Sequence, residues 1–112
     1  MNCPVVMFLE ILTFCHHKPA LNCLEMHPYF TQDEATEFYK KLKVPIAAFA
    51  PISPSINVKF LPQHQTELVK SLDLLSEKVV LDLAKKYKKT PAQIVLNWHM
   101  RQEHIVCPGM RL

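Results

Sequence analysis

Three short apolar stretches, separated by segments with helical periodicity, limit the folds open to this chain of 112 residues. The stretches are residues 20–26, 44–50 and 104–107. Uninterrupted apolar strands that alternate with helices are typical of a parallel sheet covered by those helices. The sequence therefore predicts an α/β fold with about three parallel strands and covering helices.

The helical segments repeat apolar residues at the spacing of a helix with one buried face. In the first, Val5, Leu9 and Leu12 recur at i, i+4 and i+7, and Asn2 is the expected N-cap. Thr31 and Glu34 have the spacing of a capping box. Thr90, Pro91 and Gln93 form a complete N-terminal signature with a cap, a first-turn proline and a reciprocal glutamine. We expect helices over residues 2–15, 31–42, 76–87 and 90–101.

The stretch of residues 51–71 has no clear period and contains several prolines, so we expect a long loop there. The length suits a single domain. An open sheet of three parallel strands would leave two apolar edges unpaired, which disfavours an independent domain and indicates further structure beside it.

Charge and cysteine usage narrow the function classes. The net charge of +3 comes largely from lysines near expected helix ends, which is not a nucleic-acid-binding stripe. The four cysteines have irregular spacing without a C-x-x-C motif, so we expect reduced thiols in a cytoplasmic protein, with Cys15 and Cys107 buried. We expect no membrane segment or signal peptide. The six histidines lack metal-ligand spacing, and we expect them at surface or corner positions.

Four ordered segments resemble the aldo-keto reductases, in particular the xylose-reductase-like and aldose-reductase-like members. They are residues 18–29, 46–52, 86–93 and 105–108. The most specific of them contain Glu25-Met26-His27-Pro28-Tyr29 and Lys89-Thr90-Pro91-Ala92-Gln93. The resemblance implies that residues 1–112 are a partial aldo-keto reductase domain, the C-terminal part of a TIM (β/α)8 barrel.

That family reduces aldehydes and ketones by hydride transfer from NADP(H), with a tyrosine that donates the proton. The resemblance places the family's catalytic Asp, Tyr, Lys and His in a part of the barrel that this sequence does not contain. No residue here is therefore assigned a catalytic role. We expect Tyr29, Tyr39 and Tyr87 to serve packing.

The resemblance also implies cofactor positions. Asn2 matches the asparagine that binds the nicotinamide carboxamide, and Phe49 takes the place of the tyrosine that stacks on the nicotinamide ring. Cys23 replaces a glutamine beside the carboxamide, and Ala50 replaces a serine that contacts the pyrophosphate. Gly109 follows Pro108 where the family has a phosphate-binding lysine. Cofactor binding should consequently be weak or absent.

Three interpretations stay open. The chain is a truncated reductase that acted on carbonyl small molecules and is inactive alone, or a non-catalytic fragment that self-associates through open sheet edges. It could also be the product of an incomplete gene model.

Overall fold

The computed structural model describes residues 1–52 and 72–108. Most of the long loop expected over residues 51–71 lies outside the described residues. So does Gly109. The elements in chain order are α1 (Val5–Phe14), β1 (Asn22–Glu25), α2 (Asp33–Lys41), β2 (Ile46–Phe49), the 3-10 helix η2 (Leu74–Ser76), α4 (Lys78–Tyr87), α5 (Pro91–Arg101) and β3 (Ile105–Cys107).

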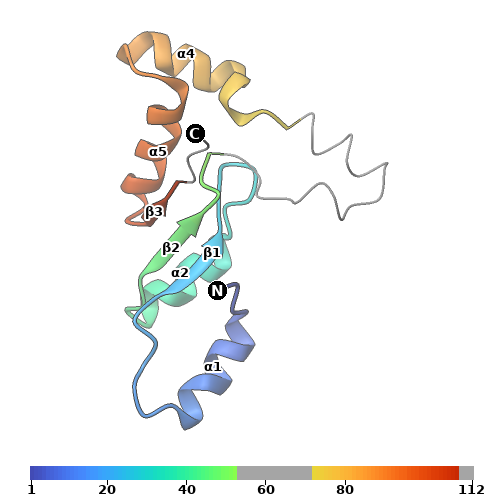
Figure 1. Cartoon of the computed structure of the whole chain (residues 1–112), viewed down its shortest axis with the longest axis vertical. Coiled ribbons are helices and arrows are strands. Elements are labelled where there is room, and N and C mark those ends of the chain that lie inside the picture. Colours follow the sequence, from blue (N-terminus) through green and yellow to red (C-terminus); the bar gives the residue numbers. More distant parts are fainter. Residues whose placement is uncertain (53–71, 109–112) are drawn as a thin grey trace, which may run out of the picture.

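The three strands form one parallel sheet in the order β1-β2-β3 (Figure 1). This confirms the predicted parallel α/β arrangement. Each strand is shorter than its apolar stretch. Pro45 lies just before β2, where no ladder donor is needed, and its carbonyl oxygen accepts from the Asn22 N–H at 3.1 Å.

One face of the sheet is covered by helices. Figure 1 shows α2 behind β1 and β2, with no described helix in front of them. The core on the covered face joins Leu24 and Ala48 of the strands to Phe8 of α1 and Tyr39 of α2. The rings of Phe8 and Tyr39 meet edge to face, with centroids 4.9 Å apart.

The buried stripe of α1 differs from the prediction. Phe8 is the buried residue of this helix, whereas Leu9 is exposed. The expected stripe was wrong at Leu9, whereas Leu12 packs against the core as expected. Nearly every position of α1 is apolar, so several stripes fit the sequence. Packing against Tyr39 decides which stripe faces the core.

A second core lies between the last two helices. Leu74 of η2, Val80 of α4 and Val95 of α5 pack together. The Thr90 hydroxyl accepts from the Gln93 N–H at 3.2 Å, and Gln93 Oε1 accepts from the Thr90 N–H at 3.0 Å. This confirms the predicted capping box. Tyr87 at the end of α4 is 58% exposed, so its expected packing role was wrong.

Two predicted caps were also wrong. The N-cap of α1 is Pro4, which has no side-chain capping bond, and Asn2 lies outside the helix with a φ of 52°. The N-cap of α2 is Gln32 in place of Thr31. In both cases a contact with β1 takes precedence over the local cap, because Asn2 and Gln32 each bond to a carbonyl of that strand.

Candidate functional site

The sheet face opposite α2 carries most of the residues singled out from the sequence. In parallel strands, paired residues point to the same side of the sheet, and positions alternate along each strand. Leu24 and Ala48 point into the core, so Cys23, Glu25 and Phe49 point to the opposite face. We call this the open face. It is formed by two rows across the strands, Cys23–Ala47–Ile105 and Glu25–Phe49–Cys107.

Phe49 stands in the middle of the second row, at the carboxyl end of β2. Its neighbours in the register are Glu25 on β1 and Cys107 on β3. The Phe49 side chain is partly buried and keeps an accessible ring. Cys107 is exposed, which contradicts the expectation that it is buried. Its strand has a described neighbour on one side only, and this explains the exposure.

Asn2 and Cys23 lie side by side at the outer edge of β1. The Asn2 N–H donates to the Cys23 carbonyl oxygen at 2.7 Å. The Asn2 side chain is exposed and the Cys23 thiol is partly buried. The fold thus brings together two expected cofactor positions that are 21 residues apart in the sequence (23 − 2 = 21).

Ala50 follows Phe49 directly and has a φ of 50°, a conformation that costs energy for a residue with a Cβ. The positive φ ends β2 and turns the chain toward Pro51. A methyl group at this position can form no hydrogen bond. The side chain of Ala50 therefore brings no polar contact to the site.

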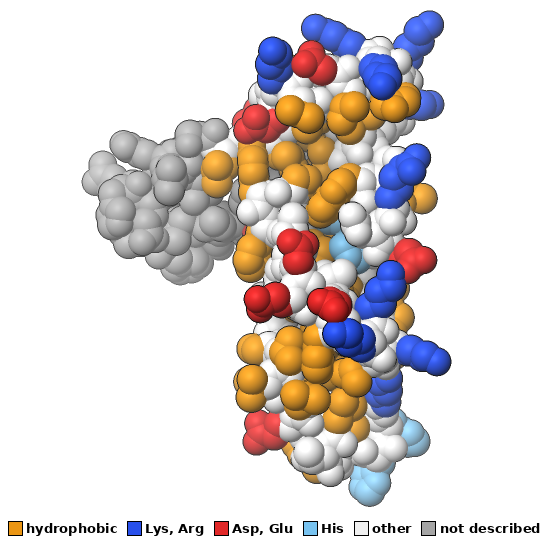
Figure 2. Space-filling view, turned by 180° about the vertical axis from the view of Figure 1, so that it is seen from behind, with side chains coloured by type: hydrophobic (Ala, Val, Ile, Leu, Met, Phe, Trp, Pro, Cys, Tyr) orange, Lys and Arg blue, Asp and Glu red, His pale blue; other side chains and the backbone are white. Residues whose placement is uncertain are grey.

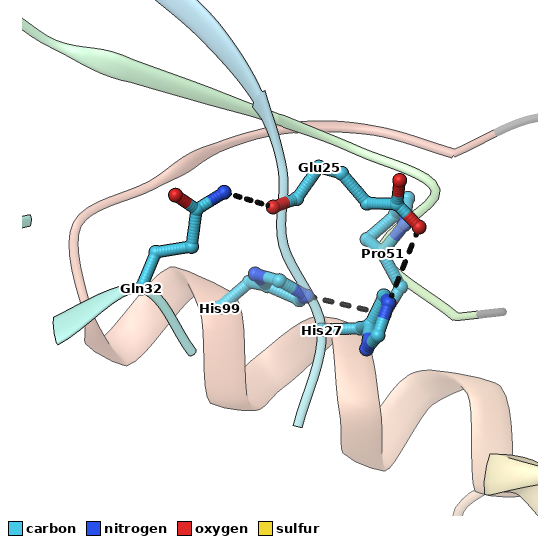
Figure 3. A network of polar contacts seen from close by, with 5 residues as sticks. All are labelled: Glu25, His27, Gln32, Pro51 and His99. Atoms are coloured by element: carbon cyan, nitrogen blue, oxygen red, sulfur yellow. Dashed lines mark hydrogen bonds and ion pairs between the residues drawn. The ribbon is translucent and has the colours of Figure 1, made fainter. Parts of the chain in front are cut away.

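Glu25 is a residue of the open face that the sequence interpretation missed. Its Oε1 lies 3.4 Å from Nε2 of His27, and its backbone oxygen accepts from Nε2 of Gln32 at 2.6 Å (Figure 3). A signal was present in the sequence, because Glu25 stands two residues after Cys23 in an otherwise apolar strand. A charge at that spacing marks the same face.

The tyrosines do not supply a proton donor to this face. Tyr39 is buried in the core, where its hydroxyl donates to the Cys3 carbonyl oxygen at 2.9 Å. The Tyr29 hydroxyl donates to the Glu77 carboxylate. That hydrogen bond, together with burial and the charges of Glu77 and Asp73, raises the pKa of Tyr29 to about 12. A carbonyl reductase needs the opposite shift in its proton donor.

The cavity next to Asn2 has a negative rim. It has a volume of about 670 Å³ and lies between the N-terminal segment and the start of α2. Glu25, Asp33 and Glu34 line it, together with Asn2 and Gln32. These carboxylates disfavour an anionic group such as a phosphate in the cavity.

The described residues contain no group of three or more His, Cys, Asp or Glu side chains placed to hold a metal ion. Within the same ranges, none of the helices has the length and apolar character that a membrane crossing needs.

The chain is similar to reductases over nearly its whole length. It is 31% identical to the NAD(P)H-dependent D-xylose reductase of Candida tenuis over 111 residues, which are 99% of this chain and 34% of that protein. It is 37% identical to aldo-keto reductase family 1 member D1 of Oryctolagus cuniculus over 92 residues, 82% of this chain and 26% of that protein. No family model matches. The chain thus spans about a third or less of these relatives.

Solved structures agree with the sequence relatives. An aldo/keto reductase from Brucella melitensis superposes with a TM-score of 0.77 and 27% identity, covering 97% of this chain and 35% of that one. The aldose reductase from Schistosoma japonicum gives a TM-score of 0.75 and 27% identity, covering 96% of this chain and 29% of that one. The three-stranded sheet therefore corresponds to part of a TIM barrel.

Proposed function

Because the chain has the sequence and the fold of one part of an aldo-keto reductase, we propose that residues 1–112 are the nicotinamide-facing part of an NAD(P)H-dependent oxidoreductase. The parent reaction would reduce an aldehyde or ketone to an alcohol. The observation that carries the proposal is the open face, with Phe49 at its centre. Catalytic groups of TIM barrels gather at the carboxyl ends of the strands, where Phe49 lies.

We assign the nicotinamide contacts to Asn2 and Phe49. The exposed Asn2 amide can pair with a carboxamide, and the Phe49 ring can stack on a pyridine ring. Cys23 and Ala50 would border the cofactor without strong hydrogen bonds. The cofactor supplies the hydride when it is bound, and these residues only orient it.

The same residues fit the rest of NADP(H) poorly. Glu25, Asp33 and Glu34 surround the Asn2 side of the site with negative charge, and Ala50 offers no donor to a pyrophosphate. We therefore propose that these 112 residues bind NADP(H) weakly or not at all. The proposal also includes no turnover by them alone, since Tyr29 and Tyr39 are engaged elsewhere.

An activity assay tests the proposal. The purified chain is mixed with NADPH and an excess of a small aldehyde, and oxidation of NADPH is followed by its absorbance. We expect a rate equal to that of NADPH and aldehyde without protein. A protein-dependent rate that scales with chain concentration would show that these residues contain a complete catalytic site.

Self-association is a second candidate function. β1 and β3 are the outer strands of the sheet within the described ranges. In α1, Val6, Met7 and Phe14 are 78%, 53% and 69% exposed. Figure 2 shows hydrophobic side chains gathered at the end of the molecule where α1 lies. Exposed apolar patches of this kind are typical of interaction surfaces.

Sedimentation velocity over a wide concentration range separates the two candidates. Self-association predicts a sedimentation coefficient that rises with concentration and falls back in the double variant Val6→Ser, Phe14→Ser. A single monomeric species at every concentration would remove this candidate.

Carbonyl compounds and NADP(H) are the small-molecule partners of the first proposal. We also propose a cytoplasmic location, because all four cysteines are free thiols, as in reducing compartments.

A further inference from the structure

Two histidine rings, those of His99 and His104, meet where α5 reaches the sheet, and a third histidine, His27, lies in the same region. His99 of α5 is fully buried, His104 is buried in the turn before β3, and His27 is buried just after β1. The ring centroids of His99 and His104 are 5.8 Å apart. Figure 3 shows the rings of His27 and His99 in the region of Pro51, which follows β2. His99 thus reaches from α5 to Pro51 after β2, and His104 lies beside it just before β3.

The sequence interpretation placed these histidines at surface or corner positions, which was wrong for His99 and His104. The missed signal is the helical spacing of Val95 and His99, which are four residues apart and both buried. His99 approaches the assigned cofactor residues only through Pro51, which follows Ala50, and none of the assigned roles explains the burial of His99 and His104.

The lack of acceptors around the remaining ring nitrogens favours the neutral form of both His99 and His104. Nε2 of His99 lies 3.1 Å from the Pro51 carbonyl oxygen, which can only accept, so Nε2 carries the hydrogen. Nδ1 of His99 and both ring nitrogens of His104 are buried without a partner among the described residues. Protonation of either ring would therefore bury an additional N–H without an acceptor.

The charged groups around the cluster do not compensate a proton on His99 or His104. On the β1 side, Glu25 is engaged with His27. On the α2 side, Lys40, Lys43 and Glu103 line the cavity that His104 borders, and Lys40 pairs with Glu103 at 3.8 Å. No carboxylate in residues 1–52 and 72–108 forms an ion pair with His99 or His104.

These surroundings lower the pKa of both rings. Burial lowers the pKa of His99, the Pro51 carbonyl opposes the shift, and a positive charge on His27 would lower it further. Burial also lowers the pKa of His104, with a further contribution from His99. An unfolded histidine takes up its proton near pH 6.5, as an approximate reference. Stability is therefore complete above about pH 6.5 and falls as the pH drops below it.

We propose that His99 and His104 form an acid-sensitive latch, which holds α5 and β3 against β2 and the segment that follows it while the two rings are neutral, and which releases them on acidification. The latch acts on the fold and is independent of cofactor binding. Its protons come from the solvent, and no other reactant is needed. Release would remove Cys107 and β3 from the open face.

The chain contains its own reporter for this transition. Trp98 is the single tryptophan, and its ring centroid lies 4.7 Å from that of His99 and 6.4 Å from that of His104. Its fluorescence is followed while the full chain is titrated from about pH 8 to about pH 5, across the range in which histidine changes charge. We expect a reversible change in Trp98 emission with one midpoint in this range.

Variants show whether His99 and His104 cause the transition in Trp98 emission. His104→Leu removes a ring whose N–H has no acceptor, and His99→Gln keeps a donor for the Pro51 carbonyl, so both retain the fold. Each should lower the midpoint by about one pH unit, the usual spread of histidine environments. The control His16→Gln changes an exposed histidine after α1 and should leave the midpoint unchanged. A midpoint that is the same in all three variants, or no transition, overturns the latch.

Nuclear magnetic resonance of the unmodified chain gives an independent measurement that needs no variant. The imidazole signals of His99 and His104 should change together with the loss of chemical-shift dispersion in the α5 amides. If the two rings become charged while the α5 amides keep their dispersion, protonation does not release α5 and the proposal is overturned.

Discussion

The Asn22 side-chain amide donates to the Tyr39 hydroxyl at 2.9 Å inside the core, and both groups hold the segment before α1. Asn22 Nδ2 also donates to the Cys3 carbonyl oxygen at 2.9 Å, and Asn22 Oδ1 accepts from the Cys3 N–H at 3.4 Å. The Asn22 side chain thereby forms both a donated and an accepted hydrogen bond with the Cys3 backbone, as a neighbouring strand would. This small network attaches the N-terminal segment, including Asn2, to the edge of β1.

Replacing Asn22 with alanine should destabilise the chain. It leaves the Cys3 N–H and part of the hydrogen-bonding capacity of Tyr39 without partners in a largely buried site, at a cost of about 1–3 kcal/mol. Urea unfolding followed by circular dichroism measures the change. Asn97→Ala is the matched control, because Asn97 is exposed and only accepts from Arg101 Nε. Equal losses in the two variants would show that the Asn22 network contributes nothing specific.

The capping box of α5 provides a second prediction. Thr90→Ala removes the acceptor of the Gln93 N–H and should cost about 1 kcal/mol. In the control Thr13→Ala, the lost hydroxyl donates only to the Glu10 carbonyl oxygen on the surface of α1. That change should cost clearly less in the same urea experiment. The prediction is wrong if Thr13→Ala is the more harmful substitution.

Phe8 and Phe14 lie on the same helix and have opposite environments. Phe8 is 2% exposed and packs on Tyr39, whereas Phe14 is 69% exposed. Phe8→Ala should cost about 3–5 kcal/mol, as is usual for a phenylalanine removed from a core. Phe14→Ala should stay within about 0.5 kcal/mol of the unmodified chain. Thermal unfolding compares the two, and a reversed order would mean that α1 packs through another face.

Tyr29 makes stability depend on pH in the alkaline range. Its bond to Glu77 raises its pKa to about 12, so folded Tyr29 keeps a proton that the unfolded chain releases from about pH 10. The folded state then binds more protons, and stability should fall as the pH rises from about 10 to about 12. Tyr29→Phe should flatten this part of the profile in urea unfolding at several pH values. An unchanged slope would show that Tyr29 is not responsible.

The sequence was most informative where structure depends on neighbours in the chain. Thr90, Pro91 and Gln93 predict the start of α5 because the capping contacts span only three residues. The parallel sheet was predictable for a similar reason, since apolar strands alternated with helices. The expected strands were nevertheless too long, because pairing with neighbouring strands sets their ends.

Contacts between distant residues explain the failures. Asn2 was expected to cap α1, yet its N–H donates to the Cys23 carbonyl oxygen. Thr31 was expected to cap α2, yet the N-cap is Gln32, whose side chain donates to the Glu25 carbonyl oxygen. Periodicity also could not choose the buried stripe of α1, in which almost every residue is apolar. Within the site, the positions of Phe49 and Cys23 on one face follow from alternation, whereas the negative rim around Asn2 requires the fold.

Titration of the folded chain with NADPH measures whether these 112 residues bind the cofactor, with binding followed by NADPH fluorescence and folding by circular dichroism. We predict that binding does not saturate below about 1 mM NADPH, which corresponds to a binding free energy weaker than about −4 kcal/mol. Phe49→Ala and the control Phe14→Ala, which changes an exposed aromatic residue of α1 outside the two rows, should then give the same curve. Saturation at micromolar NADPH that is lost in Phe49→Ala alone would contradict the account, because Asn2 and Phe49 would then form a working cofactor site.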